Sequence, residues 1–276
     1  MKLLLFDNLA SATPPAPPPS SDAILLENGK ALLTESNNEL LLDTPVPTVL
    51  AEVYGDDWDG SSTIITPTSG STLTRTGNIV KAFDSIRLGK NAFHINSTGQ
   101  WLTWDNVLSA TKMNYAIFTV ARQSGSTSGG NILDFRSAAG TEYKLILTGY
   151  RVANDQNGWY YGQASAIADF SVIAGEAMSE MKIRCWLFED NVGRLFLNGG
   201  SVDKTSVFED TALDTTLKIG GTASVSLDFY IAFIGIYALP LTKKFTASFL
   251  DSIGNALQAY YSGGSFPEPI WNPITV

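Results

Sequence analysis

Alternation of apolar residues with a period of two is the feature that most constrains the fold of this chain. Residues 112–122, KMNYAIFTVAR, carry apolar side chains on both faces of an extended strand: Met113, Tyr115 and Ile117 on one face, and Ala116, Phe118 and Val120 on the other. We expect this strand to be buried on both sides. In the segment at 181–190, Lys182 and Arg184 alternate with Ile183 and Cys185, which predicts a half-exposed strand of a sandwich.

Other segments extend the β pattern toward the C-terminus. Two apolar runs flank Asn198, Gly199 and Gly200, which predicts a hairpin because Asn and Gly tolerate positive φ. Residues 229–241 form the longest apolar run; it is too short to span a bilayer and reads as a core strand. One helix is predicted from Thr242, its expected N-cap, on an apolar stripe of Phe245, Phe249, Ile253, Leu257 and Tyr260.

The C-terminal strands resemble the laminin G-like branch of the concanavalin A-like jelly rolls. The matching positions lie in a hairpin, the next strand and a strand-to-helix junction: Leu195–Gly199, Leu217, Ile219, Gly220, Gly221, Tyr237, Leu241 and Thr242. The resemblance covers roughly residues 115–261. It departs from the family at Phe245, where a Glu usually closes a capping box, so we expect Phe245 to pack inward. The resemblance implies an all-β jelly-roll sandwich with one short C-terminal helix.

The N-terminal part of the chain has a different character. Residues 11–21 hold five prolines and predict an extended spacer. Residues 24–43 repeat short leucine runs, and a heptad seam through Leu26, Leu33 and Leu40 would be only half apolar. Links at Asn28-Gly29 and Asn37-Asn38 instead predict three short hairpin strands, which are too small to bury their own apolar faces.

These signals predict an extended N-terminal anchor segment at 1–48, a jelly roll at 49–262 and a tail at 263–276. The leucine repeats look like those near the N-termini of structural proteins of tailed bacteriophages. The resemblance implies attachment to other virion proteins (capsid or tail) and a homo-oligomer, which we expect to be a trimer. The anchoring residues would be Leu25, Leu26, Leu32, Leu33, Leu40, Leu41 and Leu42.

Charge and residue usage exclude several functions. The formal net charge is −9, without a basic cluster, which argues against nucleic acid as a partner. Cys185 and His94 are the only residues of their kinds, so a cysteine-based zinc site or a His-dependent triad has too few members. The nearest carboxylate pair, Glu189 and Asp190, falls on opposite faces of a strand. We therefore predict that the chain is not an enzyme and needs no cofactor.

An acidic turn is the one calcium candidate. Asp56, Asp57 and Asp59 are bunched before Gly60, but the spacing fails the EF-hand pattern. The favoured interpretation is a solvated acidic turn in which Trp58 packs inward.

Aromatic residues beside polar ones point to saccharide binding, because a sugar has an apolar C–H face and a polar rim. The first candidate platform is Asn154, Asp155, Trp159, Tyr160 and Tyr161. At least one of the three consecutive aromatic residues should be exposed or lie in an interface. The second candidate is Trp101 with Trp104, which the sequence favours as core residues.

The hypothesis that joins these features is a structural protein of a phage virion, a head or tail fibre or a decoration subunit on the virion surface. Its N-terminal segment would anchor it, and its jelly roll would contact host glycans. Two alternatives remain from the sequence: a free carbohydrate-binding protein similar to a lectin, and a glycan-cleaving enzyme.

Overall fold

The computed structural model describes residues 24–25, 31–32, 46–84, 89–107, 113–123, 131–137, 143–148, 157–161, 169–173, 181–189, 192–197, 200–205, 215–220 and 228–261. The chain divides into two compact units, Met1–Val46 and Pro47–Val276.

The first unit contains a pair of very short strands. β1 (Ile24–Leu25) pairs antiparallel with β2 (Ala31–Leu32), so that Ile24 lies opposite Leu32. The two segments pair as predicted, but a two-residue turn at Asn28-Gly29 would place Leu25 opposite Leu32, so the register differs from the prediction by one residue. The third predicted strand and the anchoring residues Leu26, Leu33, Leu40, Leu41 and Leu42 lie outside the described residues. The domain boundaries inferred from the sequence, at 48 and 262, stay predictions.

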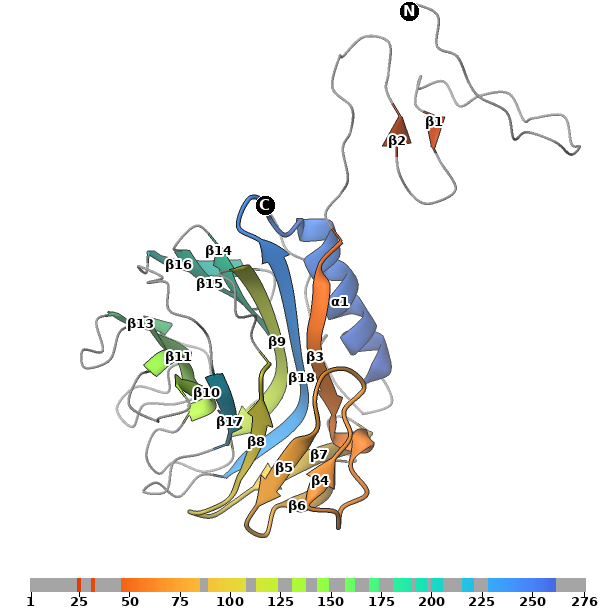
Figure 1. The fold of residues 1–276 in the computed structure, drawn as a ribbon, viewed down its shortest axis with the longest axis vertical. Helices are drawn as coiled ribbons and strands as arrows, with labels where there is room; N and C mark the ends of the chain where they lie inside the picture. Colours follow the sequence, from red (N-terminus) through yellow and green to blue (C-terminus); the bar gives the residue numbers. More distant parts are fainter. Residues whose placement is uncertain are drawn as a thin grey trace, which may run out of the picture. The chain divides into compact units, whose positions relative to one another are not determined.

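The second unit is built on two antiparallel sheets (Figure 1). The first, named here the β8 sheet, contains in spatial order β13 (Asp169–Ile173), β12 (Asn157–Tyr161), β11 (Tyr143–Thr148), β10 (Asn131–Ser137), β17 (Thr215–Ile219), β8 (Trp101–Asp105), β5 (Leu73–Thr76) and β4 (Ile64–Ile65). The second, the β18 sheet, contains β16 (Gly200–Thr205), β15 (Val192–Leu197), β14 (Lys182–Glu189), β9 (Met113–Gln123), β18 (Phe229–Pro240), β7 (Lys90–Ile95) and β6 (Val80–Asp84), with β3 (Thr48–Tyr54) also paired to β18.

Strand β18 organises its sheet because it is paired along both edges. One edge follows β9 from Phe229 to Pro240, and the other is shared first by β7 and then by β3. The register shifts between Ile231 and Phe233, so Ala232 is an extra residue in the ladder to β9, a β-bulge. The carbonyl oxygen of Ala232 accepts a hydrogen bond of 2.8 Å from the Tyr261 hydroxyl. The bulge thus lies where β3 succeeds β7.

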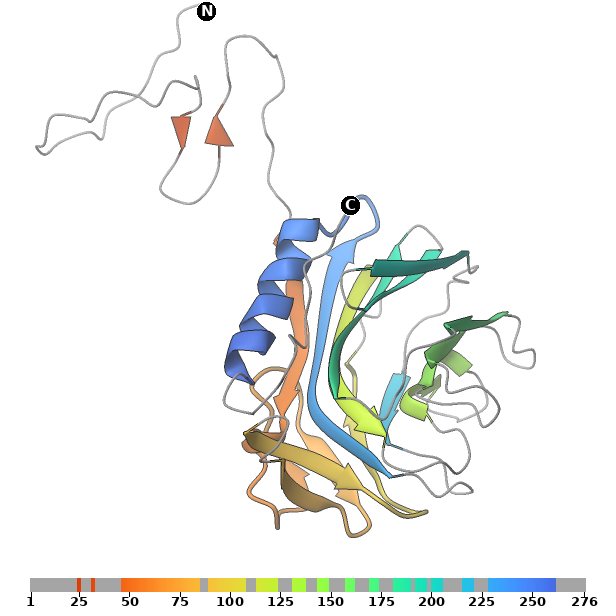
Figure 2. The same cartoon turned by 180° about the vertical axis from the view of Figure 1, so that it is seen from behind.

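Both faces of the β18 sheet are buried at its central strands. Tyr115, Ile117 and Ala121 of β9 join the core between the two sheets. Ala116, Phe118 and Val120 belong to a second core beneath helix α1 (Ala247–Tyr260), which lies along β3 and β18 in both views (Figures 1 and 2). The prediction that residues 112–122 form a strand buried on both sides is confirmed.

The core between the two sheets corrects our prediction for residues 181–190, because it contains Trp186 and Phe188, which lie on the face that we expected to be exposed. Every residue from Ile183 to Glu189 is buried, so β14 is not half exposed. Ile183, Cys185 and Leu187 pack in the core beneath α1, and Arg184 is fully buried, donating from Nη1 to the Ala121 carbonyl at 2.8 Å. The alternating charges misled the sequence analysis because the Arg184 side chain is buried on the same face as Trp186, where its Nη1 donates to backbone carbonyls instead of to solvent.

The helix begins later than predicted. Thr246, not Thr242, is the N-cap, and its side-chain oxygen accepts a hydrogen bond of 3.1 Å from the Phe249 backbone N–H. Phe245 packs inward as expected, and its N–H donates to Glu189 Oε1 at 2.6 Å. A turn at Leu241–Thr242 therefore separates β18 from the helix.

The structure confirms the predicted class, a mostly β jelly-roll sandwich with a short C-terminal helix. The predicted hairpin is present as well, since β15 pairs with β16 and Leu197 lies opposite Gly200. Among the described residues α1 is the only α-helix, and none of their helices has the length and apolar character required to cross a membrane.

Close packing at Gly55 gives a test of this architecture. Gly55 opens the short 3-10 helix η1 (Gly55–Asp57) that follows β3, and a Cβ there would lie 2.2 Å from the Asn91 carbonyl oxygen on β7. We expect Gly55→Ala to lower the free energy of unfolding in urea by about 3 kcal/mol, because rigid backbone must move.

Gly99→Ala is the matched control. Its φ of +79° strains an L-residue, but nothing lies within 4 Å of the added Cβ, so the expected loss is only about 1 kcal/mol. Equal losses for the two variants would contradict the close approach of η1 to β7.

Candidate functional site

The three carboxylates of the predicted calcium turn contact different elements. Asp57 accepts hydrogen bonds from the Tyr54 backbone N–H at 2.9 Å and from Thr68. Asp59 is exposed, and hydrogen bonds from Ser62 and Ser61 hold its pKa below the usual range. The structure does not bring the three carboxylates together, and the described residues contain no cluster of His, Cys, Asp or Glu arranged to hold a metal.

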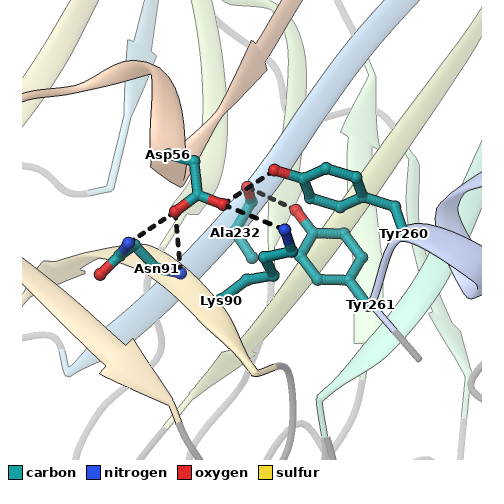
Figure 3. A network of polar contacts seen from close by, with 6 residues as sticks. All are labelled: Asp56, Lys90, Asn91, Ala232, Tyr260 and Tyr261. Atoms are coloured by element: carbon teal, nitrogen blue, oxygen red, sulfur yellow. Dashed lines mark hydrogen bonds and ion pairs between the residues drawn. The ribbon is translucent and has the colours of Figure 1, made fainter. Parts of the chain in front are cut away.

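Asp56 instead joins η1 to β7 and to the end of α1 (Figure 3). Its Oδ1 accepts from the Asn91 side chain at 2.5 Å, and its Oδ2 accepts from the Tyr260 hydroxyl at 2.8 Å. Lys90 Nζ lies 4.0 Å from Oδ2 and 4.4 Å from the centre of the Tyr260 ring. The residue after Tyr260 is Tyr261, the C-cap of α1, and its hydroxyl donates to the Ala232 carbonyl. Two adjacent residues at the end of the helix therefore hold the β-bulge at Ala232 and the turn that contains Asp56. This network is a structural junction.

Trp58 within the turn packs inward, as predicted. It is 1 % exposed and stacks on Phe93 with ring centres 5.9 Å apart. Its indole N–H donates to the Ser62 carbonyl at 3.0 Å, which closes the turn over the edge of the core.

Only the backbone of part of the first predicted glycan platform lies within the described residues. Asn154 and Asp155 lie outside the described residues, as do the side chains of β12. The backbone register places Trp159 and Tyr161 in the rows of the β8 sheet that contain the core residues Ile219 and Leu217. Tyr160 belongs to the alternate row, together with Ile146, Asp134, Lys218 and Thr103.

The outer face of the β8 sheet presents the second predicted aromatic residue. Burial alternates along β8: Leu102 and Trp104 are fully buried, whereas Trp101 and Thr103 are half-buried and Asp105 is exposed. We name the outward residues of three adjacent strands the Trp101 face: Thr74 and Thr76 of β5, Trp101, Thr103 and Asp105 of β8, and Thr216 and Lys218 of β17.

The Trp101 indole differs from the other described tryptophans. Those of Trp58, Trp104 and Trp186 each donate their N–H to a protein oxygen. Within the described part of the chain, the Trp101 N–H has no such acceptor. Lys218 is a charged neighbour of the ring, and its Nζ lies over the ring at 5.4 Å from the centre.

Polar residues occupy the other positions of the Trp101 face. Thr76 pairs with Trp101 across the strands, Thr74 pairs with Thr103, and Thr216 donates to Asp105 Oδ1 at 2.9 Å. An aromatic face with a free N–H donor, hydroxyls and an ammonium group matches the apolar face and polar rim of a saccharide.

The sequence analysis treated Trp101 and Trp104 alike, and for Trp101 the expected core position is wrong. A signal was available: on a strand, an odd spacing of three places two residues on opposite faces, so one of the pair had to face outward. Trp104 is the core member, with its N–H bonded to the Ser71 carbonyl at 2.6 Å.

The remaining candidates have structural partners. Cys185 is fully buried, and burial raises the pKa of its thiol. Glu189 is buried and bonds the backbone before α1, while Asp190 lies outside the described residues. His94 Nε2 lies 2.6 Å from Asp228 Oδ1, and its ring stacks on Tyr230 with centres 4.0 Å apart.

Comparison with known proteins identifies solved structures with a similar fold but no family to which the chain belongs. No protein-family model and no curated protein matches the sequence. Among solved structures, the sialidase of Trypanosoma rangeli matches with a TM-score of 0.57 and 14% identity over 90% of this chain and 37% of its own. Domain 4 of AbnA, a GH43 extracellular arabinanase from Geobacillus stearothermophilus, in complex with arabinotriose, matches with a TM-score of 0.51 and 12% identity over 71% of this chain and 96% of that domain.

The chain spans little more than a third of the sialidase it matches, and at these identities the likeness shows the fold alone. It nevertheless corrects one prediction. We excluded enzymatic activity because a jelly-roll carboxylate pair was missing, and the comparison overturns that exclusion, since sialidases share this fold. The lack of a carboxylate pair was not sufficient reason to exclude enzymatic activity.

The junction at Asp56 predicts a pH-dependent contribution to stability. Burial alone would raise the pKa of Asp56, but hydrogen bonds from Asn91 and Tyr260, together with Lys90, outweigh it and lower the pKa. The carboxylate therefore stabilises the fold above its unfolded pKa of about 3.9, and this stabilisation is lost as the pH falls through the folded pKa.

Tyr260→Phe should lower the free energy of unfolding by about 1 kcal/mol at pH 7, and the difference from wild type should shrink below about pH 4. Denaturant titrations over this pH range measure it. Asn255→Ala, at an exposed position of the same helix, is the control and should change stability by less than about 0.5 kcal/mol at every pH. A deficit in Tyr260→Phe that stays constant with pH would contradict the role of Asp56.

Proposed function

We propose that the second unit, Pro47–Val276, binds carbohydrate through the Trp101 face. The observation that carries this proposal is the half-exposed Trp101 indole, whose N–H has no acceptor among the described residues and which lies beside Lys218. The core tryptophans Trp58 and Trp104 differ from Trp101, because each is buried and donates its N–H to a backbone carbonyl.

The physical complementarity is specific to saccharides. The C–H face of a pyranose packs on an indole ring, while its hydroxyls need donors and acceptors at the ring's margin. Thr76 and Thr103 provide hydroxyls beside Trp101, and Asp105 provides a carboxylate already oriented by Thr216. A purely apolar ligand would leave these groups unsatisfied, which disfavours lipid as the occupant.

The two glycan platforms considered from the sequence belong, in this proposal, to one surface. Tyr160 shares a row with Lys218, three strands away in the β8 sheet, which corresponds to about 14 Å at the usual interstrand spacing. That span favours an oligosaccharide over a single sugar unit. The arabinanase domain that shares the fold was solved with arabinotriose, a trisaccharide, which supports the proposal by analogy of fold.

Trp101→Ala tests the proposal. We expect the affinity for a glycan identified on an array to fall about tenfold or more, because removing a stacked aromatic residue costs at least about 1.4 kcal/mol of binding free energy. Titration calorimetry measures the change. Mass spectrometry of the glycan after incubation separates binding from cleavage.

Arg122→Ala on β9, in the other sheet, is the control and should leave affinity unchanged. Tyr160→Ala should weaken binding of long oligosaccharides more than of short ones if the surface is continuous. Unchanged affinity in Trp101→Ala, with the circular dichroism spectrum of the wild type, would contradict the proposed site.

A second proposal concerns the N-terminal segment 1–48, which we expect to attach the chain to a larger assembly. The support is the pairing of β1 with β2: two strands of two residues each, carrying Ile24, Leu25, Ala31 and Leu32, are too short to form a buried core of their own. Such a segment gains stability by packing against copies of itself or a partner. Display on a phage virion surface, as a fibre or decoration subunit and a trimer, is the form that the leucine repeats favour.

Deletion of residues 1–48 should reduce the molar mass in solution to that of a monomer and leave glycan affinity unchanged. Light scattering coupled to size-exclusion chromatography measures the mass. Deletion of residues 1–21, which keeps the leucine repeats, is the matched control and should preserve the oligomer. An oligomer that survives removal of all 48 residues would show that the segment does not drive association.

A further inference from the structure

We infer that residues 262–276, the segment that follows helix α1, dock beside the helix on the same side of the β18 sheet, over β14 and β15. The inference concerns the sheet opposite the Trp101 face, so it does not depend on the proposed function. Its starting point is that the second core, which contains residues of β14 and β15, is wider than the helix that packs on it.

The surface in question is apolar and buried. We name it the β14 face, and it contains Met181, which precedes β14, Ile183 of β14 and Phe196 of β15. The three residues belong to the second core and are 3 %, 1 % and 7 % exposed. Every strand described in the second unit lies in one of the two sheets, and the β8 sheet packs on the opposite face. Helix α1 is therefore the one described α-helix or strand that could cover the β14 face.

Helix α1 crosses away from the β14 face. The chain enters the helix beside the end of β14, where the Phe245 N–H donates to Glu189. The helix ends at the far edge of β18, where the Tyr260 ring contacts the ring of Tyr54 on β3, with centres 4.9 Å apart. In both views the helix lies on the β3 side of β18, whereas β14 lies on the β9 side (Figures 1 and 2).

The strand register measures the gap. One row across the sheet contains, in order, Tyr54, Phe233, Val120 and Ile183. Ile183 is thus three strands from the residue that contacts the last turn of the helix, about 14 Å at the usual interstrand spacing. An α-helix with its side chains extends only about 5–6 Å from its axis. Another segment must therefore exclude water from Ile183.

Residues 262–276 have the composition for this role. They include the apolar residues Phe266, Ile270, Trp271, Ile274 and Val276 and a single charged residue, Glu268. Prolines at 267, 269 and 273 favour an extended chain over a helix. Docking of an extended apolar chain on the β14 face removes apolar surface of both from water.

The length and the starting point also fit. Tyr261 donates to Ala232 of β18, and β14 is two strands from β18, about 10 Å away. The polar linker SGGS at 262–265 spans up to about 13 Å when extended. The links at 124–130, 174–180 and 206–214 fit less well, because each joins a strand of one sheet to a strand of the other. The segment after Tyr261, in contrast, starts on the helix side of the sheet.

Photo-cross-linking in the full chain tests the contact directly. Trp271→p-benzoylphenylalanine places a group that, on irradiation, bonds to a C–H group it contacts. We expect an intramolecular cross-link to residues 181–197, located by mass spectrometry of the digested protein. A mixture of isotope-labelled and unlabelled chains distinguishes links within one chain from links between two. A cross-link to another segment, a cross-link between two chains, or none would overturn the inference.

Cys185 provides a second readout, because it is fully buried on the same side of β14 and pairs with Phe196. Trp271→Asp should raise the rate at which a maleimide modifies Cys185 about tenfold or more, since a charge disfavours the docked segment and local opening controls access. Phe83→Asp, at a position of β6 that is 63 % exposed, is the matched control and should leave the rate unchanged. Equal rates in wild type and Trp271→Asp would contradict the docking.

Discussion

Burial of the β18 sheet on both faces is the constraint on which the rest of the structure depends. One face packs against the β8 sheet, and the other lies beneath α1. Strand β18 carries this arrangement because β9 follows one of its edges while β7 and β3 share the other. The bulge at Ala232 marks the change from β7 to β3, and Tyr261 binds its carbonyl from the end of the helix. The Tyr261 hydrogen bond therefore connects the end of the helix to the point where β3 replaces β7 as the neighbour of β18.

This constraint also decides where a ligand can bind. Helix α1 packs on one side of the sandwich. Asp56 of the acidic turn, which was only a calcium candidate in the sequence, connects η1 to β7 and α1. The outer face of the β8 sheet, in contrast, carries half-buried and exposed polar residues around an indole. In the proposed function, ligand binding falls to the β8 sheet, whereas the carboxylates of Asp56 and Asp57 stabilise the fold.

The sequence predicted most of the fold because strand burial leaves a direct periodic trace. Residues 112–122 lack a polar face, and β9 proved to be buried on both sides. The predictions of strand exposure and of the helix start failed where contacts between distant segments outweigh the local sequence pattern. The charges of Lys182 and Arg184 suggested an exposed face, yet Trp186 on that face belongs to the core between the sheets and Arg184 donates to backbone carbonyls within it. Thr242 looked like the helix cap, but the chain turns first and Thr246 takes that place. Trp101 was recognisable from its odd spacing to Trp104, whereas the proximity of Lys218 required the pairing of β8 with β17.

The central claim, that the Trp101 face binds a saccharide, is tested most directly by a crystal structure of the chain with an oligosaccharide that it binds. The account predicts a sugar ring stacked on the Trp101 indole, with the indole N–H donating to an oxygen of the ligand. A ligand bound at another surface, with the Trp101 ring exposed to solvent, would contradict it.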